Sequence, residues 1–143
     1  MSAEQNKAIV SRWVASGWNT GDLSMVDELY AADYTLHSPG SPDVQGHEAF
    51  KAFVTMFRTA FPDIHFTLED LVAEGDRVAW RATSRGAHGG ELMGIPPTGK
   101  PVVISSSIVS RFDGGKWAED WVLIDMLGML QQLGVIPVPG QHD

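Results

Sequence analysis

The 143-residue sequence contains no cysteine. Disulfide bonds, thiolate nucleophiles and cysteine-ligated metals are therefore excluded. No pair among the five histidines has the spacing of a helical zinc motif, and no glycine-rich stretch ends in the Lys–Ser or Lys–Thr of a phosphate-binding loop. The sequence thus predicts a protein that works without a metal, a nucleotide or a redox cofactor.

Basic residues are also scarce, with ten Lys and Arg against 18 Asp and Glu and a net charge of −8. This balance argues against nucleic acid or an anionic membrane as a partner. No apolar run approaches the ~20 residues that a membrane span needs. The N-terminus, MSAEQNKAIV, lacks the basic flank and apolar core of a signal peptide. We expect a cytoplasmic protein.

Apolar and aromatic residues, in contrast, are plentiful. They make up 43% of the chain, which includes five Trp, six Phe and six Met. The composition does not change along the chain, and its length suits a single hydrophobic core. We therefore expect one domain over residues 1–143.

Helical periodicity dominates the first part of the chain. Ser2 can cap a first helix with an apolar stripe, and Asp22 a second, shorter one. From Gly46 to Phe61 apolar residues again recur at helical spacing, until Pro62 stops the helix. The apolar residues of these three helices are Ile9, Val10, Trp13, Val14 and Gly17; Val26, Leu29 and Tyr30; and Phe50, Phe53, Val54, Phe57 and Phe61.

Strand-like alternation dominates the second part. After a brief extended piece at 34–37, apolar and polar residues alternate along four longer segments, with a hairpin turn at Asp113-Gly114-Gly115 before the last. Helices first and a run of strands afterwards predict an α+β domain. The four predicted strands cover 64–69, 77–88, 102–112 and 117–125.

The strand at 117–125 passes directly into a helix that begins at Met126. Alternation along the strand places Trp117, Trp121 and Asp125 on one face. A carboxylate against large apolar side chains resists ionisation and becomes a stronger base. Asp is also a favoured N-cap, where amide donors stabilise the ionised form instead. The sequence leaves both interpretations of Asp125 open.

Two histidines, His37 and His88, end strands whose inward faces are otherwise apolar or small. Each is either a strand-end histidine satisfied by the backbone or a neutral imidazole in a cavity. In the second case it can donate to a substrate carbonyl or transfer a proton. The remaining histidines are expected at the surface: His47, His65 and His142.

Several side chains are candidates for binding a substrate. The glycine- and proline-rich segment 89–100 is expected to form a flap over a cavity, with Met93 and Ile95 as its apolar underside. Ser107 offers a hydroxyl from an unusual run of three serines in a strand. Five aromatic residues belong either to the core or to a pocket lining: Tyr34, Phe53, Phe57, Trp80 and Trp121.

Several short motifs resemble the SnoaL-like polyketide cyclase family of the nuclear transport factor 2-like superfamily. The resemblance covers roughly Ala8 to Pro137. The motifs are Glu119-x-Trp121-x-x-x-Asp125 with Gly128 and Gln132-Leu133-Gly134, together with Gly86-Ala87-His88, Gly94-Ile95-Pro96-Pro97-Thr98-Gly99-Lys100 and Phe61-Pro62-Asp63.

This resemblance implies N-terminal helices packed in a highly curved mixed β-sheet, an α+β barrel that encloses a cone-shaped cavity. It also places the family's catalytic acid at Asp125. The implied reaction is a cofactor-independent, intramolecular aldol-type ring closure of a small hydrophobic substrate that contains carbonyl groups. Epoxide opening, double-bond isomerisation and small-molecule binding without turnover are the alternatives.

The outer face of the sheet is expected to carry a subunit contact. On the predicted alternation, Val122 and Ile124 lie on the face opposite Trp121 and Asp125. Apolar surface outside the core commonly marks such a contact. We therefore expect a homodimer.

Overall fold

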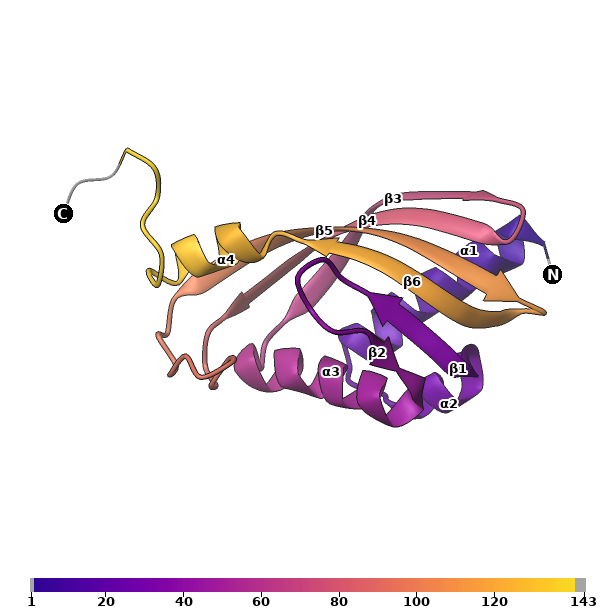
Figure 1. Ribbon diagram of the computed structural model, residues 1–143, viewed down its shortest axis with the longest axis horizontal. Helices are drawn as coiled ribbons and strands as arrows, with labels where there is room; N and C mark the ends of the chain where they lie inside the picture. Colours follow the sequence, from indigo (N-terminus) through magenta and orange to yellow (C-terminus); the bar gives the residue numbers. More distant parts are fainter. Residues whose placement is uncertain (1, 141–143) are drawn as a thin grey trace.

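The computed structural model describes residues 2–140, so that His142 lies outside the described residues. Helices cover one face of a single sheet, and a short helix continues from the last strand (Figure 1). The helices are α1 (Ala3–Trp13), the π-helix η1 (Val14–Trp18), α2 (Ser24–Leu29), α3 (Gly46–Ala60) and α4 (Met126–Gln132). No described helix is long and apolar enough to span a membrane.

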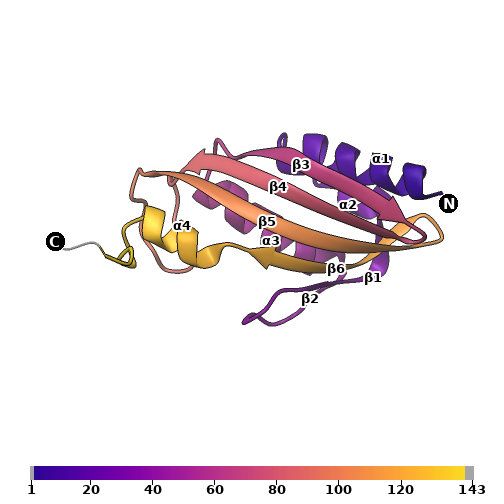
Figure 2. The same cartoon turned by 90° about the horizontal axis from the view of Figure 1, so that it is seen from above.

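The sheet is mixed and six-stranded, with the order β2-β1-β6-β5-β4-β3. Strand β1 runs parallel to β6, and the other neighbours are antiparallel. Figure 2 looks onto the sheet, with β3 to β6 side by side and α3 behind them. The predicted α+β class and mixed sheet are confirmed. The strands are β1 (Tyr30–His37), β2 (Val44–Gln45), β3 (His65–Glu74), β4 (Arg77–Ala87), β5 (Pro101–Asp113) and β6 (Lys116–Ile124).

The core lies between the helices and the inner face of the sheet. Helix α1 begins with a capping box in which the Ser2 hydroxyl accepts from the Gln5 amide and the Gln5 side chain accepts from the Ser2 amide. Strand β5 alternates strictly, so that every even-numbered residue from Val102 to Phe112 is buried. The sheet therefore presents one face to the helices and one to solvent.

A β-bulge at the start of β6 changes which residues of that strand face inward. The pairing with β5 shifts by one residue between Arg111 and Phe112, and both Trp117 and Ala118 are buried. Because the extra residue reverses the alternation, Val122 points inward instead of outward.

The predicted faces of this strand are consequently wrong beyond the bulge. Val122 and Ile124 line the inside of the molecule, whereas Trp121 and Leu123 are exposed on the outer face. The predicted alternation starts from Trp117, which lies before the bulge, and therefore assigns every later residue of the strand to the wrong face.

The π-helix places Gly17 directly against the ring of Trp13, a fully packed core residue. A Cβ atom built on Gly17 would lie 2.1 Å from Trp13 ring atoms. We expect Gly17→Ala to lower the free energy of unfolding by about 1–3 kcal/mol, the usual effect of overpacking. Urea unfolding measures the change, with Ala15→Ser, an exposed position in the same segment, as the control. Equal stability of the two variants would contradict this account.

Candidate active site

An apolar cavity lies between the helices and the inner face of the sheet. The volume of this cavity is about 60 Å³. Among the described residues that line it, none is basic and one is acidic, Asp120. The lining residues are Trp13, Trp18, Tyr30, Leu36, Phe50, Phe53, Phe57, Ile64, Phe66, Trp80, Ser84, Ile104, Ser106, Ile108, Trp117, Asp120, Val122 and Ile124.

Three donors hold the buried carboxylate of Asp120. Its Oδ1 accepts from Ser110 Oγ at 2.5 Å and from Trp117 Nε1 at 2.8 Å, and its Oδ2 accepts from Tyr34 Oη at 2.5 Å. Ser110 Oγ in turn accepts from Trp80 Nε1 at 2.9 Å. The carboxylate is thus fixed by side chains from β1, β4, β5 and β6.

Burial dominates the electrostatics of this group. Desolvation raises the pKa of Asp120 from 3.8 to about 6, although the hydrogen bonds from Ser110, Tyr34 and Trp117 lower it. Burial also raises the pKa of Tyr34, and the charge of Asp120 raises it further. Tyr34 therefore remains a protonated donor, while Asp120 can exchange a proton near neutral pH.

Asp125 lies outside this cavity. It is exposed at the start of α4, where its Oδ1 accepts from the Gly128 amide at 2.9 Å. The interpretation of Asp125 as an N-cap is confirmed, and the expectation of a carboxylate desolvated by tryptophans is wrong. The bulge in β6 explains the error, because it leaves Trp117 facing inward but turns Trp121 to the outer face.

His37 lies on the outer face as well, at the end of β1. Its ring is stacked on Trp121 and bridges Asp43 and Glu119 at 3.0 and 2.6 Å. The hydrogen bond to Glu119, followed by that to Asp43, raises the pKa of His37. Of the two interpretations of His37, the neutral imidazole in the cavity is therefore wrong.

His88 is fully buried but does not line the cavity. Its Nδ1 accepts from the Thr98 amide at 3.1 Å, and its backbone amide and carbonyl bond to Lys100 and Gly99. His88 thus anchors the segment 89–100 to the end of β4. It matches the interpretation of a strand-end histidine held by local hydrogen bonds.

The remaining candidates divide between three places. Phe53, Phe57 and Trp80 line the cavity beside Asp120's network, and Tyr34 belongs to that network. In the segment 89–100 the buried apolar residue is Leu92, whereas Met93 is exposed and Ile95 half-buried. Trp121 and Ser107 line a groove on the outer face, whose volume is about 640 Å³.

Sequence reasoning missed Asp120, the acidic residue of the cavity. Strict alternation from Trp117 put Asp120 on the opposite face from the tryptophans. One signal was available, because Ser106 and Ser110 alternate with apolar residues on the inner face of β5, where a hydroxyl needs a polar partner. The structure pairs Ser110 directly with Asp120.

The raised pKa of Asp120 predicts a pH-dependent stability. Between pH 3.8 and about 6 the folded protein keeps a proton that the unfolded chain releases. The free energy of unfolding should therefore fall as the pH rises through this window, by at most about 3 kcal/mol. Urea unfolding at several pH values measures how the free energy of unfolding changes with pH.

Asp120→Asn supplies the comparison, since the amide retains the acceptor for Ser110 and Trp117 but does not titrate. The difference in unfolding free energy between the wild type and this variant should change across the window. A difference that is constant from pH 4 to 7 would show that Asp120 ionises normally.

Comparisons with known proteins agree with the architecture. A family model described as SnoaL-like polyketide cyclase matches residues 8–133. Aklanonic acid methyl ester cyclase DnrD of Streptomyces peucetius is 32% identical over 130 residues, which cover 86% of this chain and 87% of that protein. Both comparisons extend over most of the chain.

Two solved structures are similar over comparable lengths. AclR of Streptomyces galilaeus, a candidate hydroxylase, has 35% identity and a TM-score of 0.85, covering 97% of this chain and 87% of its own. IdmH of Streptomyces antibioticus, a candidate polyketide cyclase, has 34% identity and a TM-score of 0.79, covering 92% and 99%. The chain belongs to the SnoaL-like polyketide cyclase family.

Proposed function

We propose that this protein is a cyclase that closes a ring by intramolecular aldol addition, with Asp120 as the acid/base group. The observation that carries the proposal is one titratable carboxylate, fully buried among aromatic side chains and fixed by three donors. Its pKa of about 6 suits proton transfer at neutral pH. Membership of a cyclase family supports the same reaction.

The proposed reaction transfers one proton away from the substrate and back. Asp120 removes a proton from the carbon next to a carbonyl group, and the C–H electron pair becomes an enolate. The enolate carbon then attacks a second carbonyl carbon of the same molecule, which forms the C–C bond of the ring and leaves an alkoxide. Protonated Asp120 returns its proton to the alkoxide, so that the carboxylate is regenerated.

The cavity favours a neutral, mainly apolar substrate. Its lining contains one carboxylate and, among the described residues, no basic side chain that would bind a substrate anion. The name of DnrD indicates that this relative acts on a methyl ester, and an ester is uncharged. We propose an esterified polyketide as the substrate class.

The size of the cavity limits how such a molecule can enter. About 60 Å³ is well below the ~300–1,000 Å³ of typical ligand sites. Phe53, Phe66 and Ile124 are the lining residues that are only half-buried. We propose that these side chains move apart to admit a substrate of several rings.

Asp120→Asn tests the proposed base. The variant keeps the shape and two of the hydrogen bonds but cannot accept the proton. We expect kcat on aklanonic acid methyl ester to fall by ~10²–10⁴, the usual contribution of general acid/base catalysis. In the wild type, kcat/KM should rise with pH through about 6, as Asp120 ionises.

Asp125→Asn is the matched control, since Asn is as good an N-cap as Asp. We expect it to retain both activity and stability. Wild-type activity that depends on Asp125 and not on Asp120 would overturn the assignment of the base.

Binding without turnover is the second candidate function. It is favoured by the three donors that already occupy the Asp120 carboxylate, an arrangement that also suits a structural network. Saturable binding of the ester with no product from either the wild type or Asp120→Asn would favour this alternative over the cyclase.

We further propose a homodimer through the outer face of the sheet. Apolar side chains gather there, including Trp121 and Leu123, which are 37% and 61% exposed. Oppositely charged groups lie on the same face, with Arg81 paired to Asp70 and Arg111 to Glu119. A face that carries both signs can meet a second copy of itself across a two-fold axis.

Leu123→Glu should place two carboxylates in this contact and convert the dimer to a monomer. Leu127→Glu is the control, because Leu127 is 58% exposed but lies on α4, away from the outer face of the sheet. Sedimentation equilibrium at micromolar concentration measures the mass. A wild-type monomer, or a Leu123→Glu dimer, would contradict the proposed contact.

A further inference from the structure

We infer that the Tyr30 hydroxyl donates a hydrogen bond to the substrate carbonyl oxygen that becomes negatively charged in the reaction. The inference rests on the proposed function, because it assigns a second catalytic residue in the same cavity. It concerns a separate step, since Asp120 handles the proton whereas Tyr30 would stabilise the oxyanion.

The hydroxyl of Tyr30 is a buried donor with no partner. Tyr30 lines the cavity and is 2% exposed, and its Oη makes no hydrogen bond within the protein. The neighbouring Tyr34, in contrast, donates to Asp120. An unpaired buried hydroxyl is costly, and native proteins seldom keep one without a function. A ligand oxygen in the cavity would satisfy it.

The ring of Tyr30 is held firmly by other aromatic rings. It stacks on Trp117 with centroids 4.7 Å apart and 12° between the planes, and Trp117 also donates to Asp120. Tyr34 contacts the ring of Tyr30 edge-on, with ring centroids 4.7 Å apart. The ring centroids of Trp13 and Phe50 lie 5.3 and 4.8 Å from that of Tyr30. The phenol ring is therefore held against the tryptophan that donates to Asp120, and an oxyanion site requires such a fixed donor.

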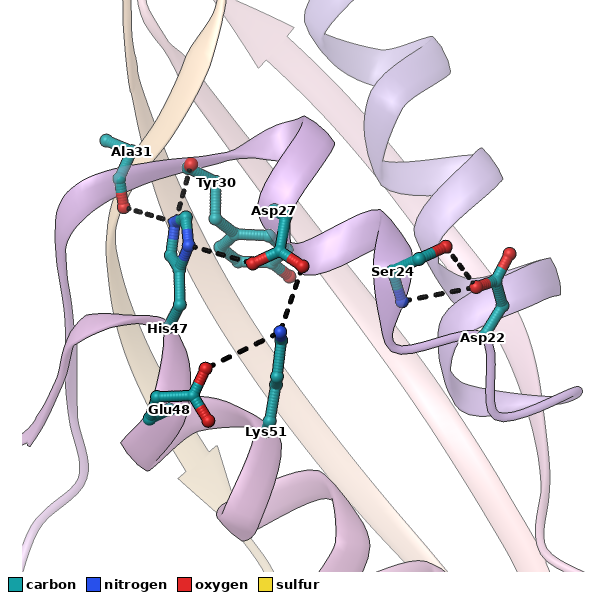
Figure 3. A network of polar contacts seen from close by, with 8 residues as sticks. All are labelled: Asp22, Ser24, Asp27, Tyr30, Ala31, His47, Glu48 and Lys51. Atoms are coloured by element: carbon teal, nitrogen blue, oxygen red, sulfur yellow. Dashed lines mark hydrogen bonds and ion pairs between the residues drawn. The ribbon is translucent and has the colours of Figure 1, made fainter.

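The backbone of Tyr30 is held as well. His47 Nε2 lies 2.9 Å from the carbonyl oxygen of Tyr30 and 3.0 Å from the carbonyl oxygen of Ala31 (Figure 3). Because carbonyl oxygens can only accept, His47 Nε2 is the donor of these hydrogen bonds. Asp27 lies 3.2 Å from the other ring nitrogen of His47 and pairs with Lys51 at 2.9 Å. This network joins α2, β1 and α3 and fixes the point from which the Tyr30 ring enters the cavity.

Tyr30 keeps its proton throughout the reaction. Burial raises its pKa well above that of free tyrosine, and the charge of Asp120 raises it further. When Asp120 takes the substrate proton, the negative charge moves to the substrate oxygen. A neutral phenol can stabilise that charge by a hydrogen bond, without transferring its own proton.

Four other donors of the cavity are already engaged or distant. Trp80 and Trp117 donate to Ser110 and Asp120, and Ser84 Oγ lies 3.4 Å from the carbonyl oxygen of Ile104. Ser106 is four residues from Ser110 along β5, which corresponds to about 13 Å at the rise of a strand. Tyr30 combines an unpaired hydroxyl with a ring that is stacked on Trp117, a donor to Asp120.

Tyr30→Phe removes the hydroxyl and keeps the ring. We expect kcat on aklanonic acid methyl ester to fall by ~10²–10³, the usual effect of deleting one oxyanion donor. Stability should not decrease, because no protein hydrogen bond is lost. Ser105→Ala is the control, because it removes an exposed hydroxyl from the outer face of β5 and should retain activity. Full activity of Tyr30→Phe in a protein whose Asp120→Asn variant is inactive would overturn the inference and leave the proposed base intact.

A spectroscopic test does not depend on turnover. Cyclohexanone carries a carbonyl acceptor that methylenecyclohexane lacks. We expect the wild type to bind the ketone more tightly and to lower its infrared carbonyl stretching frequency, as a hydrogen bond does. Both effects should disappear in Tyr30→Phe and persist in Asp120→Asn. The role of Tyr30 would be refuted if the wild type bound neither compound or bound both equally well. It would also be refuted if the carbonyl stretching frequency were lowered in Tyr30→Phe as much as in the wild type.

Discussion

The burial of one carboxylate constrains much of this structure. Asp120 cannot be ionised inside an aromatic cavity unless donors surround it, and the fold supplies three from separate strands. Desolvation still prevails over these donors and raises the pKa of Asp120 to about 6. The same feature that makes the carboxylate costly to bury therefore makes it suitable for exchanging a proton near neutral pH.

The bulge in β6 is the local device that brings this carboxylate inside. Without the extra residue, strict alternation would turn Asp120 to solvent and Trp121 into the cavity. With it, Trp117 and Asp120 face the helices together, and Trp117 both donates to Asp120 and supports the ring of Tyr30. One irregularity in one strand thus positions both the buried carboxylate and the neighbouring phenol.

The reversal also explains the two faces of the sheet. Inside, the residues of β6 complete an apolar cavity with a single acid. Outside, Trp121 stacks on His37 and lies under Arg77, whose guanidinium carbon is 5.0 Å from the ring centroid. The outer groove combines apolar surface with charges of both signs, a composition suited to contact with another protein surface. The proposed acid/base group and the proposed subunit contact thereby lie on opposite faces of one sheet.

The sequence by itself determined the order of elements, because periodicity and capping are local. The helices around Trp13 and Phe57, the long alternating β5 and the N-cap at Asp125 could all be predicted this way. The inward turn of Asp120 could not, since a bulge depends on how β6 pairs with β5, between residues that no local pattern relates. Only the tertiary structure brings Tyr34 to Asp120, 86 residues away. It also decides the pKa of Asp120, because the pKa of a buried group depends on distant neighbours and on the exclusion of water.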